Sequence, residues 1–306
     1  MLGRMLKSNT AAPAAAPEHD LSDLAFQIQQ RELEVAYKQA LYTGQQLING
    51  LLAQPELADP KRLERHGWKA YSQNDEDGVL AEIFRRIGVR HRSFVEFGCG
   101  NGMENNTLYL LSQGWHGLWI DGSQDNAATI QRAYAPLIAQ NQLQFSCSFI
   151  TRDNINELIG TAQLGPEIDL LSIDLDGNDY HIWEAISAVN ARVVVAEYNA
   201  RFRPPHDWCM DYDAGHEWSG TDFMGSSLEA LTRLGTARGY QLAGCNIVGV
   251  NAFFVRNDLA GELFAAPASA GHLFQPPRYD LGFCLKNGHP LDPRTVVHGA
   301  IRAQRT

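Results

Sequence analysis

Ser93-Phe-Val-Glu-Phe-Gly-Cys-Gly-Asn-Gly102 is an apolar run that stops at three glycines in alternate positions. The pattern predicts a buried strand, a tight turn and the start of a helix. Gly98, Gly100 and Gly102 lack the Cβ atoms that would keep a bound group away from the backbone, and they tolerate positive φ where the chain turns. Glu96 falls near the carboxyl end of the strand, where open α/β sheets place their ligand crevice. The stretch therefore predicts a ligand that lies across the turn.

A second apolar run, Gly117-Leu-Trp-Ile-Asp-Gly-Ser123, follows after the distance expected for one helix and one strand. Asp121 is then positioned to accept hydrogen bonds from ribose hydroxyls. An acid just before the glycines suits the cationic amino-acid part of a cofactor better than a pyrophosphate, whose negative charge Glu96 would repel. These residues favour S-adenosylmethionine over a dinucleotide. A glycine-rich connection with no ligand is the simpler alternative.

Composition and charge exclude several classes of protein. The chain has 306 residues, of which 44% are hydrophobic and 20% charged, as is ordinary for a globular protein. A net charge of -10 argues against broad nucleic-acid binding, because neutralising phosphates requires a basic face. The five cysteines form no CxxC pair, which indicates a reducing compartment and no structural zinc. We find no apolar stretch that could span a bilayer and no secretory signal after Arg4 and Lys7, so we expect a cytoplasmic protein.

Four segments are expected along the chain. Residues 1–20 are rich in alanine and proline, which predicts a flexible tail. Residues 21–67 form a helical extension, because apolar residues recur there at helical spacing. This extension could form a homo-oligomer with a second copy of the chain or pack within its own chain, and both interpretations stay open. A catalytic domain is expected over residues 68–260 and a C-terminal tail over residues 261–306.

Strands and helices alternate through the expected domain. After the strand that ends at Gly98, further strands are predicted over 115–121, 143–150, 168–174 and 192–197. The alternation predicts an α/β fold with a Rossmann-like, doubly wound sheet that is mostly parallel. Strands over 240–244 and 251–256 would close the sheet as an antiparallel C-terminal hairpin. Before the first strand, Ser72, Gln73 and Asp77 could cover the cofactor pocket, while capping of the next helix by Asn74 or Asp75 explains the same polar residues equally well.

The densest group of candidate catalytic residues is Ser172-Ile-Asp-Leu-Asp-Gly-Asn-Asp-Tyr180. Asp174 and Asp176 could hold a divalent cation, orient a substrate hydroxyl or accept its proton. Asp179 is expected to cap the following helix instead. Glu197 ends the neighbouring strand and brings another carboxylate to the same edge of the sheet.

A long irregular connection over residues 199–226 follows, and connections of this length are more often functional than accidental. His206 and His216 are reserve candidates for a general base. Aromatic rings such as those of Trp208 and Trp218 could stack on the apolar face of a sugar, although a loop packed by its own aromatic residues explains them nearly as well. The predicted substrate-binding residues are Asn199, His206, Trp208 and Trp218.

Several stretches together resemble class I methyltransferases of the FkbM-like type. They are Phe94–Gly102, Ile173–Tyr180, Val195–Asn199 and Gly249–Val255, and Tyr71–Gly78 is also similar. The resemblance implies a class I methyltransferase fold, S-adenosylmethionine as cofactor, and O-methylation of a sugar, a glycan or another small hydroxylated metabolite. It does not extend to the N-terminal helical segment or to the tryptophan-containing connection.

The predicted site follows from the residues and the resemblance together. The predicted cofactor contacts are Glu96, Gly98, Gly100, Asn101, Gly102, Asp121, Gly122, Ser123 and Asp174. Asp174, Asp176 and Glu197 are the predicted catalytic groups, and Asp174 and Glu197 would be the ligands of a divalent cation such as Mg²⁺. Methyl transfer is an in-line displacement, so holding donor and hydroxyl about 3 Å apart can supply most of the catalysis. The hydroxyl also needs a base or a metal to lose its proton.

Two rival functions remain. Asp174-Leu-Asp176 is also the DxD pattern by which many glycosyltransferases hold a metal and a nucleotide diphosphate, but that interpretation gives Glu96 and the glycine turn no role. A non-catalytic protein that uses the same fold for binding is the third possibility.

Overall fold

The computed structural model describes residues 21–285 and 289–304, so the tail expected over residues 1–20 lies outside the described part of the chain. The chain divides into two compact units, Met1–Thr43 and Gly44–Thr306. Helix α1, Leu21–Leu52, is continuous across the boundary between them. Within the described residues, no helix combines the length and the apolar character that crossing a membrane requires.

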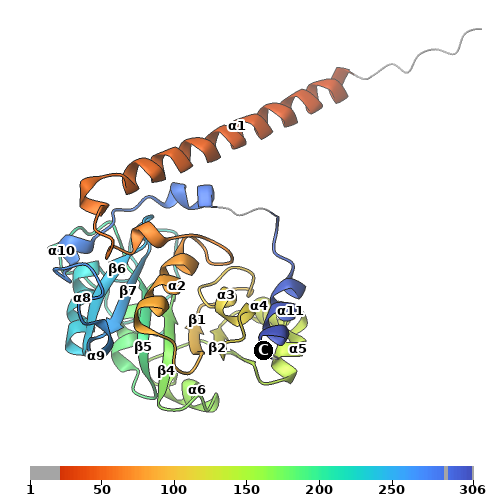
Figure 1. The fold of residues 1–306 in the computed structure, drawn as a ribbon. Coiled ribbons are helices and arrows are strands. Elements are labelled where there is room, and N and C mark those ends of the chain that lie inside the picture. The colour runs from red at the N-terminus through yellow and green to blue at the C-terminus, as the bar shows by residue number, and fades with distance from the viewer. Residues whose placement is uncertain (1–20, 286–288, 305–306) are drawn as a thin grey trace, which may run out of the picture. The chain divides into compact units, whose positions relative to one another are not determined.

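The larger unit is built on a seven-stranded sheet with the order β3-β2-β1-β4-β5-β7-β6 (Figure 1). The strands are β1 Ser93–Phe97, β2 His116–Asp121, β3 Leu143–Cys147, β4 Glu167–Ile173, β5 Asn190–Glu197, β6 Tyr240–Cys245 and β7 Asn251–Arg256. The first five are parallel, whereas β7 lies antiparallel between β5 and β6. The Rossmann-like, doubly wound sheet with an antiparallel C-terminal hairpin is therefore confirmed. The strand order reverses between β1 and β4, which is where such sheets bind ligands.

Two buried apolar clusters cover the two faces of the sheet, because successive side chains of a strand point to opposite faces. Val95 and Phe97 belong to one cluster, and Phe94 belongs to the other. Helices α6 Ile155–Thr161, α7 Asp179–Ala185, α8 Leu228–Ala237 and α10 Ala270–Leu273 contribute to the first cluster. Helices α2 Glu76–Ile87, α3 Leu108–Ser112, α4 Gln124–Ala133, α5 Ala135–Ala139, α9 Asn257–Ala260 and α11 Pro293–Ala303 contribute to the second. Short 3₁₀ helices span Pro55–Leu57, Glu64–His66 and Tyr279–Leu285.

The stretch set apart as a C-terminal tail supplies part of this core. Helix α11 packs against α3, with Val296 and Ala300 completely buried. Gly299 allows the close approach, since a Cβ there would lie 2.8 Å from the backbone oxygen of Ser112. How the chain divides functionally stays a prediction, but residues beyond 260 belong physically to the larger unit.

Candidate functional site

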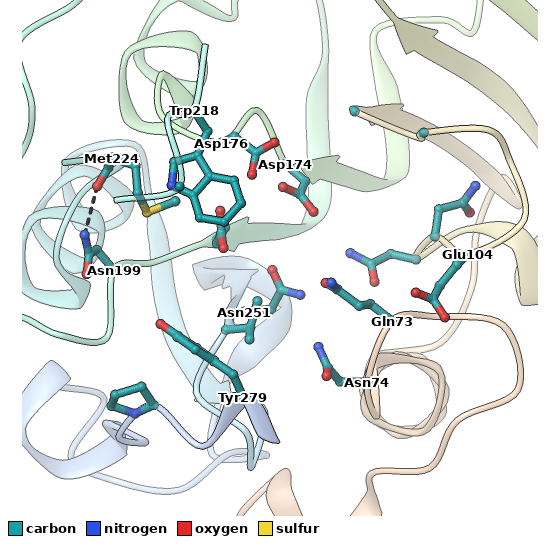
Figure 2. Close-up of a pocket in the computed structure, with 18 of the residues that line it drawn as sticks. Gln73, Asn74, Glu104, Asp174, Asp176, Asn199, Trp218, Met224, Asn251 and Tyr279 are labelled. Carbon is teal, nitrogen blue, oxygen red and sulfur yellow. Dashed lines mark hydrogen bonds between the residues drawn. The ribbon is translucent and has the colours of Figure 1, made fainter. Parts of the chain in front are cut away.

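A cavity of about 850 Å³ lies at the carboxyl ends of β1, β2, β4 and β5 (Figure 2). Its lining includes residues that end or follow these strands, among them Gly98, Asp121, Asp174 and Glu197. A second cavity of about 120 Å³ shares Gly98 and Asp121 with the first and extends to Phe149 and Ile150. The larger volume is of the size that binds small ligands and cofactors.

Two glycines of the turn after β1 serve different purposes. Gly98 has φ 66°, and a Cβ there would lie only 1.8 Å from the backbone oxygen of Asp174. The turn can therefore pass this close to the end of β4 only without a side chain. Gly100 has φ 56° and lines the cavity, and a Cβ there would meet nothing within 4 Å. At Gly100 the missing side chain leaves the backbone open to a ligand.

Glu96 closes the loop between β1 and α3. It is buried, and its carboxylate accepts hydrogen bonds from the backbone N–H groups of Asn106 at 2.8 Å and Thr107 at 3.2 Å. The hydroxyl of Thr107 donates to the same carboxylate. Burial raises the pKa of Glu96 to about 7, although these donors oppose the rise. Glu96 thus lines the cavity and also fixes the loop that forms one of its walls.

Asp121, the last residue of β2, ties the turn after β1 to the end of the neighbouring strand. Its Oδ2 accepts a hydrogen bond from Gly100 N–H at 2.9 Å. Its Oδ1 accepts from Ser123 N–H at 2.9 Å and from Asn126 Nδ2 at 3.0 Å. Because Asp121 lines both cavities, its carboxylate stands at their junction.

Of the other predicted cofactor contacts, Gly122 borders a cavity, whereas Asn101, Gly102 and Ser123 do not. Gly122 lines the smaller cavity, and Ser123 caps α4 by accepting a hydrogen bond from Asn126 N–H at 3.3 Å. Asn101 accepts from Met103 N–H at 3.0 Å and lies outside both linings. Gly102 also lies outside them, because its Cα faces the buried side chains of Trp119, Ile130 and Tyr134.

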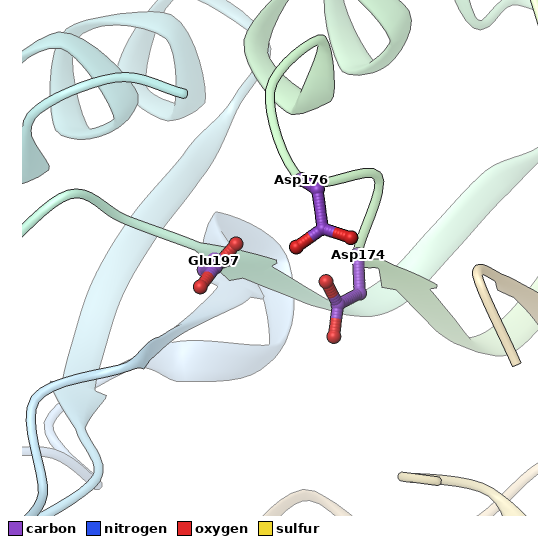
Figure 3. Close-up of side chains that lie close together, drawn as sticks. All are labelled: Asp174, Asp176 and Glu197. Carbon is purple, nitrogen blue, oxygen red and sulfur yellow. The ribbon is translucent and has the colours of Figure 1, made fainter. Parts of the chain in front are cut away.

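Asp174, Asp176 and Glu197 bring their carboxylates together at the ends of β4 and β5 (Figure 3). One oxygen of each lies within 4.8 Å of the others. Burial raises the pKa of all three, and the negative charges of neighbouring carboxylates add to this for Asp174 and Glu197. Oε2 of Glu197 is buried without a hydrogen-bond partner among the described residues. Carboxylates this close either share protons or hold a cation.

The prediction that Asp179 caps α7 is wrong, because Asn178 occupies the N-cap position and Asp179 is the first residue of the helix. Its buried carboxylate accepts hydrogen bonds from the N–H groups of Leu175 and Gly177, each at 3.1 Å. Burial raises its pKa to about 6. Asp179 therefore holds the turn that carries Asp174 and Asp176 and does not line the cavity.

The long connection after β5 places only some of its predicted residues at the cavity. Asn199 lines it and donates Nδ2 to the backbone oxygens of Asp222 at 2.9 Å and Met224 at 3.0 Å. Trp218 lines it with 53% of its surface exposed. His206 and Trp208 lie outside the lining, and the Trp208 ring packs on Phe202 with centroids 4.4 Å apart. The reserve base His216 borders only the smaller cavity.

The polar segment before α2 also contributes to the cavity. Gln73 and Asn74 line it. Asp77 instead shapes the segment, because its Oδ2 accepts from the N–H groups of Ala70, Tyr71 and Ser72. Neither Asn74 nor Asp75 caps the helix, since Asp75 occupies the N-cap position without a side-chain bond.

Other residues of the cavity lining were not predicted from the sequence. Glu104 and Asn105 follow the glycine turn, and their proximity to it was the available signal. Asn251 begins β7 and lies directly opposite Glu197 in the antiparallel register. The predicted C-terminal hairpin indicated that these strands belong to one sheet, but it did not predict which residues pair. Tyr279 comes from the C-terminal stretch, where no motif predicted a contact with the cavity.

The cavity lining is strongly acidic. Within the described residues, it holds seven carboxylate residues and one basic residue, Arg201. Arg201 pairs with Asp222 at 2.8 Å, and Glu104 pairs with Lys69 at 2.9 Å. The remaining acids leave the cavity negative, which favours a ligand with positive charge and disfavours a diphosphate.

Comparisons with known proteins give similarity at the level of solved structures. No family model matches the chain, and no curated protein matches it. An S-adenosylmethionine-dependent methyltransferase from Clostridium acetobutylicum ATCC 824 is 12% identical over 58% of this chain and 89% of its own, with a TM-score of 0.37. A putative O-methyltransferase from Klebsiella pneumoniae is 15% identical over 72% and 98%, with a TM-score of 0.41. A putative rRNA-methylase from Clostridium thermocellum is 10% identical over 57% and 94%, with a TM-score of 0.36. At these values the function has to be argued from the residues of this chain.

Proposed function

We propose that this protein is an S-adenosylmethionine-dependent methyltransferase that methylates a hydroxyl of a sugar, a glycan or another small metabolite. One observation carries the proposal. A single cavity is lined by an open glycine turn at Gly100, by the acid Asp121 at the end of β2, and by the carboxylates at the ends of β4 and β5. The first two features suit a nucleoside, and the third suits removal of a proton from a hydroxyl.

The residues present fit the cofactor. Gly100 would allow the cofactor to approach the backbone, and Asp121 would accept hydrogen bonds from ribose hydroxyls. The smaller cavity, bordered by Phe149 and Ile150, offers an apolar surface for the base. S-adenosylmethionine supplies a methyl group on a positively charged sulfonium, and the acidic lining matches that charge.

Asp174, Asp176 and Glu197 are the groups we assign to the acceptor hydroxyl. With a raised pKa, a carboxylate of this group can accept the hydroxyl proton near neutral pH. The same oxygens fit a divalent cation such as Mg²⁺, because Oε2 of Glu197 is buried without a partner among the described residues and Asp174 lies beside it. A cation held by Asp174 and Glu197 would lower the pKa of the hydroxyl.

The negative charge of the cavity lining argues against the alternative function as a glycosyltransferase. A nucleotide diphosphate in this cavity would face seven acids, and the one basic residue that the described part of the chain contributes to the lining, Arg201, already pairs with Asp222. One cation on Asp174 and Asp176 would offset only part of that repulsion. The non-catalytic alternative shares the binding site and differs from our proposal only in turnover.

Calorimetric titration with S-adenosylhomocysteine tests the proposed cofactor site. We expect the wild-type protein to bind it, and Asp121→Ala to weaken binding at least tenfold, because three hydrogen bonds at the junction of the cavities are lost. Asp125→Ala, an exposed acid in the first turn of α4, is the matched control and should bind like wild type. EDTA should leave this binding intact, since the cation belongs to the acceptor side.

Absence of binding to either S-adenosylmethionine or S-adenosylhomocysteine would refute the proposal, and UDP-sugars with Mn²⁺ would then be tested. Transfer of a labelled methyl group to neutral sugars separates the enzyme from a binding protein. In that assay Asp174→Asn should abolish turnover. Cofactor binding by the same variant is measured in parallel.

A further inference from the structure

Two aromatic side chains of the described residues, Trp218 and Tyr279, line the cavity, and neither packs on another described ring. They keep 53% and 57% of their surface exposed. The other aromatic residues of the connection after β5 pack on one another, since the ring centroid of Trp208 lies 4.4 Å from that of Phe202 and 6.2 Å from that of Phe223. Packing within the loop therefore explains those rings, but it does not explain Trp218 and Tyr279.

The indole of Trp218 is held in place by its own loop. Its Nε1 donates a hydrogen bond to the backbone oxygen of Thr221 at 2.8 Å, which uses the one donor of the ring. What the side chain still offers to the cavity is its apolar surface. Figure 2 shows Trp218 on the side of the cavity that carries Asp176. A molecule that contacts the indole is therefore also close to the acceptor carboxylates.

The segment that carries Tyr279 is fixed to the turn between β6 and β7. The N–H of Arg278 donates to the backbone oxygen of Val248 at 2.8 Å, and its guanidinium donates to that of Ile247 at 2.7 Å. Because β7 pairs with β5, this turn lies beside the end of β5 that carries Glu197. Partial burial and the negative charge of Glu197 raise the pKa of Tyr279. The ring thus reaches the acceptor carboxylates from the opposite direction to Trp218.

The two aromatic side chains bound one part of the cavity. In Figure 2, Trp218 lies on the side of Asp176, and Tyr279 lies on the side of Asn251. The connection that carries Trp218 follows β5, and the turn that holds Tyr279 belongs to the neighbouring β7. The nucleoside is assigned to Asp121 at the end of β2, which is separated from β5 by β1 and β4. Trp218 and Tyr279 are therefore at the acceptor end.

Polar groups accompany the two rings. Glu197 and Asn251 lie opposite each other in the register of β5 and β7, and Thr221 follows Trp218 in the same loop. A sugar ring matches this combination, because it presents C–H groups on its faces and hydroxyls around its edge. An acceptor with an apolar edge would leave the polar groups of the lining without partners. An acidic sugar would be repelled by the carboxylates, so a neutral sugar fits best.

We infer that Trp218 and Tyr279 bind the acceptor by packing on the ring of a neutral sugar. The inference rests on the proposed function and narrows its acceptor from hydroxylated small molecules to neutral sugars. Trp218 was a predicted substrate contact, whereas Tyr279 is a new acceptor-binding residue from the stretch set apart as a C-terminal tail. Neither side chain is assigned to the nucleoside, so the two rings affect the acceptor without affecting the cofactor.

The test is a methyl-transfer assay with labelled S-adenosylmethionine and the methyl glycosides of glucose, galactose, mannose and rhamnose. With the glycoside that the wild type uses best, Trp218→Ala and Tyr279→Ala should each raise KM about tenfold and leave kcat nearly unchanged. Tyr279→Phe keeps the ring and should have the KM of the wild type. Phe223→Ala removes another exposed aromatic side chain of the connection, outside the lining, and is the matched control.

Calorimetry with S-adenosylhomocysteine on the same variants shows that the fold and the cofactor site are intact. An unchanged KM in Tyr279→Ala, or a Tyr279→Phe variant as impaired as Tyr279→Ala, would overturn the assignment of the ring. If the wild type binds S-adenosylhomocysteine but methylates none of the glycosides, the sugar acceptor is wrong although the cofactor site stands. If the wild type does not bind S-adenosylhomocysteine, the proposed function itself fails.

Discussion

At Glu197 the proposed function and the stability of the fold should oppose each other. Its Oε2 has no partner among the described residues, and burial beside Asp174 raises its pKa. We predict that Glu197→Gln raises the free energy of unfolding by about 1 kcal/mol, or Tm by about 2 to 4 °C, because folding raises the pKa of this carboxyl group and therefore costs free energy near neutral pH. Methyl transfer should fall at least a hundredfold in the same variant.

Thermal unfolding of the ligand-free protein in EDTA measures the stability effect. Glu217→Gln, in the exposed part of the connection after β5, is the control and should leave Tm unchanged. A lower Tm for Glu197→Gln would mean that the carboxylate stabilises the fold, and its assignment to the acceptor would lose its physical basis.

The sequence predicted those cavity-lining residues whose position follows from the end of a strand. Gly100, Asp121, Asp174 and Glu197 all line the cavity, because parallel strands end at one edge of the sheet. The direction in which a loop side chain points depends on packing and could not be predicted from the sequence. Asn101 is next to Gly100 in the sequence, yet its side chain bonds locally and lies outside the lining. The charge of the cavity also depends on segments far apart in the sequence.

Among the elements, α2 carries an ion-pair network that should make stability depend on pH. Glu82 accepts hydrogen bonds from Arg85 at 2.6 Å and from Arg86 at 2.8 Å. These partners lower its pKa from 4.5 to about 2. The carboxylate therefore stabilises the fold fully above about pH 4.5, and the contribution is lost as the pH falls towards 2.

We predict that Glu82→Gln lowers the free energy of unfolding by about 2 kcal/mol at pH 7, allowing for solvent around the exposed Arg85. The difference from wild type should shrink at pH 3, where most of the unfolded chain already carries the proton. Urea unfolding at pH 7, 4 and 3 measures this. Glu157→Gln on the exposed side of α6 is the control. A difference that stays constant from pH 7 to pH 3 would show that the ion pairs are not the cause.

Helices and strands could be predicted where a run of apolar residues was long enough to show a regular spacing. The parallel strands and α2 stand out as continuous or regularly spaced apolar residues. Helix α11 had a local signal, since Asp292 accepts from Arg294 N–H at 3.0 Å and Pro293 follows at the first helical position. The surrounding alanine, glycine and proline residues concealed it.

At the scale of the whole molecule, the unit Met1–Thr43 presents large apolar side chains to solvent. They are Leu24, Phe26, Ile28, Leu33, Val35, Tyr37 and Tyr42. With 3.6 residues per turn, Phe26 and Leu33 fall on one stripe of α1, and Ile28 and Val35 fall on the opposite stripe. Apolar stripes on a helix are stabilised when another helix packs on them, so we predict that copies of this chain associate through α1.

Light scattering should then give the intact protein a mass that is a multiple of one chain, and Leu33→Lys should reduce it to a single chain. Gln27→Lys lies on the helix between the two stripes and should leave the mass of the assembly unchanged. Because every residue that lines the cavity belongs to Gly44–Thr306, both variants should bind S-adenosylhomocysteine with wild-type affinity. An intact protein that is monomeric at micromolar concentration would refute pairing through α1. Loss of binding in Leu33→Lys, but not in Gln27→Lys, would instead show that association shapes the site. We do not expect this result, because the cavity lies within one unit.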